Sequence, residues 1–265
     1  MRGFPNGCFV YIIRPHKYVN IKLQSPNMHL AILVTNTDTS PFAAQHPLDG
    51  EKFTRLIHLV RPDWLTTVFQ THQGQFPSDI TAFDGAMITG SPASTRSGLP
   101  WIAPLLTLIQ QMHEIRFPLF GACFGHQAIA LALGGAVAKN PNGWVHGLIP
   151  NQSCATLPWA QQLETEFSLY GSHSEYVSKL PQQAQEWATS TGLNAGFCIG
   201  RQIWTSQHHP EMSPDFIAAL TEEMRTELGP DLYSQAKASL AILADQTTFA
   251  ECLACFFEQT SRAPL

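Results

Sequence analysis

The feature that most constrains the fold of this chain is a cysteine between two glycines. Residues 121–125, Gly-Ala-Cys-Phe-Gly, follow a short apolar run at 118–120, and helical spacing continues over 127–133. A nucleophile on a tight strand-to-helix turn requires glycines on both sides, because larger side chains would collide across the turn. The pattern predicts a nucleophile elbow that presents the Cys123 thiol above a sheet.

The elbow would also activate this thiol. The positive N-terminus of the following helix favours the thiolate over the thiol. The backbone N–H of Phe124 would be placed to bind a developing oxyanion. The alternative is a buried structural cysteine in a glycine-rich connection. The other five cysteines lack flanking glycines, and Cys252 and Cys255, three residues apart on an apolar helix, indicate core packing rather than a metal site.

Strand and helix patterns alternate through the first half of the chain. Apolar strand candidates cover 30–34, 65–69, 83–89 and 118–120, with helical patterns at 50–60, 99–113 and 127–133. This alternation predicts an α/β fold with an open, mostly parallel, twisted sheet flanked by helices, of the flavodoxin-like type.

The second half of the chain differs from the first. Short strand candidates dominate it, which favours antiparallel additions to the main sheet, at 136–138, 145–150, 167–170, 186–190, 197–200 and 202–206. From residue 214 the pattern is helical, and we expect a final helix over 249–258 to pack on the sheet.

Composition changes at Met28, which divides the chain into two parts. Residues 1–27 carry three prolines and several basic side chains before the first long apolar run. We expect either a disordered leader or a translation start at Met28 itself, with an ordered extension or a targeting peptide as the remaining alternatives. Residues 28–265 are expected to form one domain with a helical C-terminal extension.

Composition also excludes several classes of function. The net charge of −5 gives no basic surface, so nucleic acid is not an expected partner. No apolar run reaches the roughly 18 residues of a membrane span. The six cysteines are scattered, which predicts neither a disulfide scaffold nor a metal site and favours a reduced, cytoplasmic location. The sequence also lacks the Gly-rich, Lys-containing loop of an ATP-dependent synthetase.

A thiol nucleophile needs a base, and position selects one of the eleven histidines. His209 and Glu211 follow a strand candidate and lie two residues apart, so both side chains point to one side of an extended segment. The carboxylate can orient one ring nitrogen and leave the other facing the thiol. His208 would point the opposite way. The alternatives are a solvated surface turn and, less favoured, a metal site.

A third segment ends a strand with Thr-Gly-Ser-Pro at 89–92. In an open α/β sheet, ligands bind at the carboxyl ends of the strands. The Gly90 amide is therefore a candidate second oxyanion donor, and the alternative is an ordinary turn.

Four segments together resemble the class I glutamine amidotransferase family, particularly the glutaminase domain of GMP synthase and its stand-alone relatives. The four occur in family order, at 89–92, 121–127, 170–175 and 207–211. His208 stands where the family usually has an aromatic residue, and Ser174-Glu175 replaces the usual Gly-Asp.

The resemblance implies a role for each matching residue. Cys123 would form a γ-glutamyl thioester, His209 would transfer the proton, and Glu211 would orient His209. Gly90 and Phe124 would hold the oxyanion. The amino-acid end of the substrate would be bound by Gln127, Ser172, His173, Ser174 and Glu175. No metal and no cofactor is implied.

Three functions follow as hypotheses. The first is a stand-alone enzyme that hydrolyses the side-chain amide of glutamine, or another γ-glutamyl amide, with a separate synthetase subunit as a candidate partner. The second is a γ-glutamyl peptidase or hydrolase that acts on γ-glutamyl peptides or conjugates. The third is a non-catalytic regulatory protein on the same scaffold.

Overall fold

The computed structural model of the protein describes residues 27–260. The predicted leader, apart from Asn27, and the last five residues of the C-terminal extension lie outside this range.

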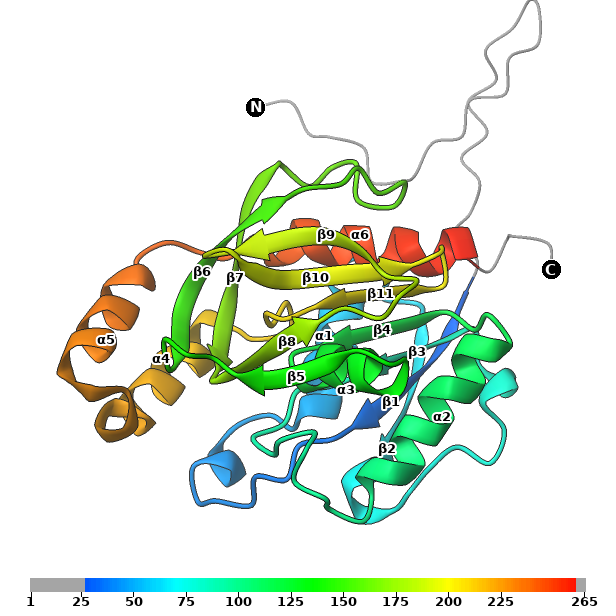
Figure 1. Ribbon diagram of the computed structural model, residues 1–265, viewed down its shortest axis with the longest axis horizontal. Helices are drawn as coiled ribbons and strands as arrows, with labels where there is room; N and C mark the ends of the chain where they lie inside the picture. The colour runs from blue at the N-terminus through cyan, green and yellow to red at the C-terminus, as the bar shows by residue number, and fades with distance from the viewer. Residues whose placement is uncertain (1–26, 261–265) are drawn as a thin grey trace, which may run out of the picture.

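The central layer is a nine-stranded sheet whose first part is parallel (Figure 1). Its five parallel strands run in the order β2-β1-β3-β4-β11. They are β1 (His29–Val34), β2 (Leu65–Gln70), β3 (Gly85–Ile88), β4 (Leu119–Ala122) and β11 (Ile203–Ser206). The predicted α/β fold with a mostly parallel core is confirmed.

The sheet continues from β11 with antiparallel strands, as predicted for the second half of the chain. These strands are β10 (Leu193–Ile199), β9 (Gln185–Ser190), β6 (Val145–Ser153) and β7 (Glu166–His173). One part of this prediction is wrong: β5 (Ala136–Lys139) does not join the main sheet. It pairs instead with β8 (Glu175–Lys179), a strand that the sequence pattern did not predict. Most residues of β8 are exposed or partly exposed, so its sequence has only a weak apolar pattern. The strand is held in place by its pairing with β5.

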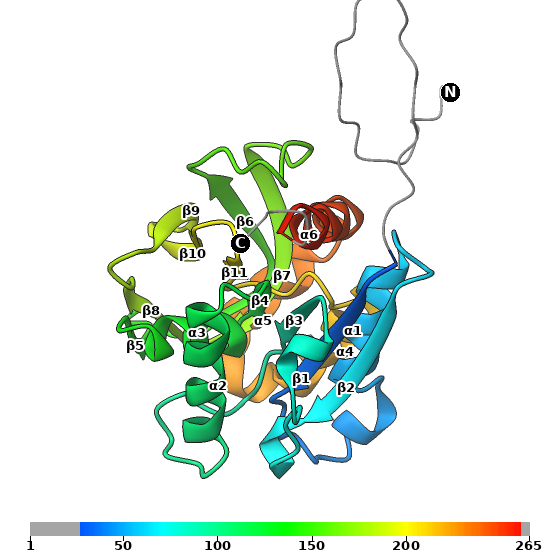
Figure 2. The same ribbon diagram turned by 90° about the vertical axis from the view of Figure 1, so that its right-hand side faces the viewer.

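Helices cover both faces of the parallel strands (Figure 2). One face carries α1 (Asp49–His58) and α6 (Gln246–Thr260), which share a core with the inward side chains of β1 and β4. The other face carries α2 (Ile102–Glu114) and α3 (Phe124–Ala132). The predicted final helix does pack on the sheet: Phe249 stacks on Trp204 with ring centroids 4.8 Å apart.

The remaining helices are peripheral. Helices α4 (Pro214–Glu223) and α5 (Arg225–Ser239) lie beside β6 and β7 at one end of the molecule (Figure 1). Short 3₁₀ turns occur at η1 (Ala43–Gln45), η2 (Thr71–Gln73) and η3 (Ile80–Ala82). Among the described residues, no helix is both long and apolar enough to cross a bilayer.

The turn between β4 and α3 has the geometry of a nucleophile elbow. Cys123 has a φ of 49°, in the left-handed region that non-glycine residues rarely adopt. A Cβ on Gly121 would lie 2.7 Å from the carbonyl carbon of Gly125, and a Cβ on Gly125 would lie 2.5 Å from the carbonyl oxygen of Ile88. Both glycines are therefore required by close backbone approach, the second by contact with β3 rather than across the turn.

Candidate active site

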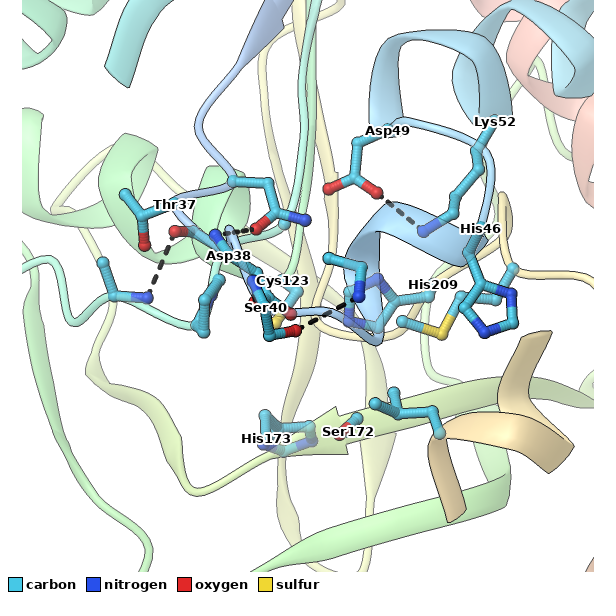
Figure 3. A pocket seen from close by; sticks show the side chains of 18 of the residues that line it. Thr37, Asp38, Ser40, His46, Asp49, Lys52, Cys123, Ser172, His173 and His209 are labelled. Atoms are coloured by element: carbon cyan, nitrogen blue, oxygen red, sulfur yellow. Dashed lines mark hydrogen bonds and ion pairs between the residues drawn. The ribbon is translucent and has the colours of Figure 1, made fainter. Parts of the chain in front are cut away.

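Three loops meet at the carboxyl edge of the parallel strands. Gly90 follows β3, Cys123 follows β4 and His209 follows β11. All three line a pocket of about 1160 Å³, which Figure 3 shows from close by. The pocket edge thus brings together three side-chain and backbone groups that are far apart in sequence.

A buried histidine–carboxylate pair faces the thiol. His209 Nδ1 lies 2.7 Å from Glu211 Oε1, and both residues are nearly inaccessible to solvent. Since a carboxylate only accepts, Nδ1–H donates to it and the other ring nitrogen remains for Cys123. The backbone N–H of His209 donates to the carbonyl of Tyr170 at 2.7 Å, which fixes the loop against β7.

The electrostatics of this group favour an ion pair. Desolvation disfavours the imidazolium, but the Glu211 carboxylate and the hydrogen-bonded sulfur of Cys123 outweigh it, and together they raise the pKa of His209 well above its ordinary value of 6.5. A charged imidazolium beside the sulfur stabilises the thiolate in turn. The arrangement can therefore deliver an anionic sulfur nucleophile and a proton from the same pair.

The two backbone groups considered as oxyanion donors belong to residues that lie close to Cys123. Phe124 begins α3, so its N–H has no carbonyl in a preceding helical turn to bond. Gly90 is so close that a Cβ built on it would lie 2.7 Å from His209 Cε1 and 3.8 Å from Cys123 Cβ. Gly90 and Phe124 are thus both near the reacting residue, as expected from the sequence.

Gln127 presents an acceptor to the pocket. Its amide nitrogen lies 3.1 Å from the carbonyl of Glu175 and 3.2 Å from Gln207 Oε1. Both N–H groups are therefore directed into the protein, and Oε1 is the atom left for a donor in the pocket, such as an ammonium group.

The segment 172–175 also lines the pocket, but its side chains differ in availability. The Ser172 hydroxyl lies 3.0 Å from His146 Nδ1 and is therefore already hydrogen-bonded. His173 donates through Nδ1 to the carbonyl of Glu175 at 2.9 Å. Ser174 contributes to the lining between them.

The carboxylate of Glu175 is already engaged. It accepts from the Ser94 hydroxyl at 2.8 Å and pairs with the Arg96 guanidinium at 2.5 Å. Any contact of Glu175 with a substrate therefore shares the carboxylate with these two groups.

Two further parts of the site were not singled out by sequence reasoning. Gln207 directs its amide nitrogen to Cys123 Sγ at 3.7 Å. The far wall of the pocket is formed by the segment after β1 and by α4, where the Lys52 ammonium, paired with Asp49 at 2.8 Å, lies 3.4 Å from the centre of the Phe216 ring. Gln207 could have been predicted, because residues two apart in an extended segment point to the same side and Gln207 is two residues before His209. No sequence motif marks the residues of the far wall.

Residues 27–260 contain no group of three or more His, Cys, Asp or Glu side chains that could hold a metal ion. His208, the neighbour of His209 in sequence, donates to Asn151 Oδ1 at 2.7 Å, in line with the expectation that it points away from the thiol.

Comparison with known proteins shows which family the chain belongs to. Residues 57–217 match the family model "Glutamine amidotransferase class-I". The chain belongs to this family. Among curated relatives, a candidate glutamine amidotransferase of Saccharomyces cerevisiae is 34% identical over 61% of this chain and 68% of its own. Gamma-glutamyl peptidase 3 of Arabidopsis thaliana is 26% identical over 59% of this chain and 67% of its own.

The fold is shared with solved structures of this family. A glutamine amidotransferase from Thermotoga maritima superposes with a TM-score of 0.70, covering 90% of this chain and 100% of that one, at 16% sequence identity. At this identity the likeness concerns the fold.

The first prediction concerns the space at Gly90. Gly90→Ala is expected to displace the His209 imidazole, because the new Cβ would lie 2.7 Å from its Cε1. A shift of about 1 Å in a reacting group costs on the order of 100-fold in rate. Steady-state kcat with a γ-glutamyl amide would measure the loss, with circular dichroism to verify the fold. Wild-type kcat in a folded variant would contradict the assignment of this contact.

The second prediction concerns buried histidines near the site. Burial lowers the pKa of His126 to about 3 and, with repulsion from the His209 charge, the pKa values of His146 and His173 to about 4. In the unfolded chain these groups titrate near 6.5. Their contribution to stability is complete above pH 6.5 and is lost as the pH falls toward 4, because unfolding takes up protons in this window.

We expect the free energy of unfolding to fall by about 1 kcal/mol per pH unit for each such histidine below pH 6.5. Urea unfolding at pH 5 to 7.5 would measure how the free energy of unfolding changes with pH. His146→Asn should make this slope shallower, because unfolding would then take up about one proton fewer. A slope that is equal in this variant and in the wild type would contradict the lowered pKa of His146.

Proposed function

We propose that this protein cleaves γ-glutamyl amide bonds through a thioester on Cys123, with His209 and Glu211 completing the catalytic group. The observation that carries the proposal is the buried His209–Glu211 pair beside a cysteine in a strained elbow. Burying such a pair costs desolvation energy, and groups with strongly perturbed pKa values cluster at functional sites. Membership of the family, whose members are generally amide hydrolases, supports the same chemistry.

The proposed reaction has two stages. The Cys123 thiolate attacks the γ-carbonyl carbon, and the carbonyl electrons move to the oxygen, which the amides of Gly90 and Phe124 hold. Collapse breaks the C–N bond while the His209 imidazolium gives its proton to the leaving nitrogen. Water then attacks the thioester, His209 takes a proton from it, and glutamate leaves as the thiolate is restored.

Binding of the glutamyl part would use the side chains near the thiol, on the side of Gln127, which lies one turn along α3 from Cys123. Gln127 Oε1 and the Glu175 carboxylate are acceptors that suit the α-ammonium group of the substrate. Arg96, paired with Glu175 next to the pocket, supplies the positive charge that we assign to the α-carboxylate. For glutamine as substrate, we propose a separate synthetase subunit as the acceptor of the ammonia.

The third prediction tests the nucleophile. Cys123→Ala should reduce ammonia or amine release by at least about 10⁴-fold, because no other group can form the thioester. A coupled glutamate assay with glutamine and with γ-glutamyl peptides would measure it. Cys198→Ala is a matched control, since Cys198 is also buried but lies on β10, outside the pocket lining.

Activity retained in Cys123→Ala would refute the proposal. Failure of a γ-glutamyl chloromethyl ketone to label Cys123 in the folded wild-type protein would instead favour the non-catalytic alternative.

The pocket favours a second candidate, a γ-glutamyl peptidase or hydrolase. Its volume of about 1160 Å³ is above the roughly 300–1,000 Å³ typical of pockets for drug-sized ligands, and far more than one amino acid fills. Beyond the thiol it is lined by apolar side chains, among them Phe42, Phe216, Leu220 and Met224. This space suits a leaving group larger than ammonia.

The fourth prediction follows from this space. If the leaving group occupies it, kcat/KM should be at least about 10-fold higher for a γ-glutamyl amide with a bulky apolar amine than for glutamine, since each well-placed apolar group adds about 1–3 kcal/mol. Leu220→Trp, which would fill the far wall, should lower kcat/KM for the bulky amide more than for glutamine. Equal or better use of glutamine would favour the glutaminase.

A further inference from the structure

The Gln207 side chain contacts the reacting sulfur but has no part in the reaction as described above. This residue directly follows β11 and is 1% exposed. Its amide nitrogen lies 3.7 Å from Cys123 Sγ, and its amide oxygen lies 3.2 Å from Gln127 Nε2. The backbone N–H of Gln207 donates to the carbonyl of Ala195 at 2.8 Å, which anchors the residue to β10.

The direction of this amide is determined by its neighbours. The carbonyl of Glu175 can only accept, so Gln127 must turn its NH₂ group toward it, at 3.1 Å. The second N–H of Gln127 then faces Gln207, whose amide oxygen must accept the hydrogen bond. Gln207 is left with its NH₂ group toward the sulfur, and the reverse orientation would place two donors against each other.

The contact has a chemical consequence because sulfur changes as an acceptor when it ionises. A thiol is a weak acceptor, whereas a hydrogen bond to a buried anion is charge-assisted and roughly twice as strong as a neutral one. An N–H directed at Sγ therefore favours the thiolate and limits its rotation. Gln207 and His209, two residues apart, reach the sulfur from the same loop, whereas His208 between them bonds to Asn151.

We infer that Gln207 is a further residue of the catalytic site, which holds Cys123 Sγ as an oriented thiolate, and that Gln127 positions it. This inference rests on the proposed role of Cys123 as the nucleophile. It assigns Gln127 two tasks, because its oxygen faces the pocket while its nitrogen fixes the amide that contacts the sulfur. The substrate-binding wall and the nucleophile are thereby joined by one chain of hydrogen bonds.

The test, and the fifth prediction, uses the reactivity of the thiol rather than turnover. The full chain is alkylated with iodoacetamide across a pH series, and modification of Cys123 is followed by mass spectrometry. Gln207→Leu should raise the pH of half-maximal alkylation by about one unit, and thus slow alkylation about 10-fold at low pH, because a charge-assisted bond is lost. Gln207→Glu should raise it further, since a carboxylate would face the sulfur.

Gln246→Leu is the matched control. The Gln246 amide also supports this loop, donating to the carbonyls of Pro210 and Met212 at 2.7 and 3.0 Å, but its recorded contacts are with backbone rather than with sulfur. It should keep the wild-type pH of half-maximal alkylation.

An unchanged curve in both Gln207 variants would overturn the inference, as would an equal shift in Gln246→Leu. If Gln207→Leu does not fold, as judged by circular dichroism, the near-isosteric Gln207→Glu decides the matter alone. Failure of the proposed function would be seen separately: Cys123→Ala would then keep full activity, whatever the alkylation curves show.

Discussion

The site depends on how closely the start of α3 approaches the end of β3. Gly125 lies against the carbonyl oxygen of Ile88, where a Cβ would come within 2.5 Å, and its N–H donates to the carbonyl of Thr89 at 3.2 Å. This contact places the helix N-terminus at the sheet edge and leaves the chain one tight route between β4 and α3. The backbone strain of this tight turn falls on Cys123, whose φ is 49°. A non-glycine residue in this conformation costs about 1–3 kcal/mol of stability. The burial of nearly all of α3 offsets this cost.

The parallel half of the fold was predictable because its strands are continuous apolar runs. The strand at 30–34 is buried on both faces, so it has no polar alternation to obscure it, and the turn residues mark its ends. The strand at 175–179 was not predicted, for the opposite reason. Only Val177 of its five residues is buried. The strand is ordered by pairing with the strand at 136–139, a contact between distant segments that no local pattern encodes.

The residues around the sulfur were predictable to the extent that local geometry specifies them. Glycine spacing indicated Cys123, and two-residue alternation indicated His209 with Glu211, which the structure places 2.7 Å apart. The engagement of Glu175 by Arg96 could not be predicted, because these residues are far apart in sequence and belong to different segments. The far wall of the pocket could not be predicted for the same reason, because tertiary packing places Lys52 over the ring of Phe216.

The electrostatics of the site follow from which histidine has an anionic neighbour. His126, His173 and His209 are all buried, and burial alone lowers the pKa of an imidazole. For His126 and His173 the hydrogen-bond partners are a hydroxyl and a carbonyl, so their pKa values fall to about 3 and 4. His209 instead faces the carboxylate of Glu211 and the sulfur, and its pKa rises. One charged imidazolium is thus surrounded by neutral ones, so the proton needed by the leaving group is confined to the ring that contacts Cys123.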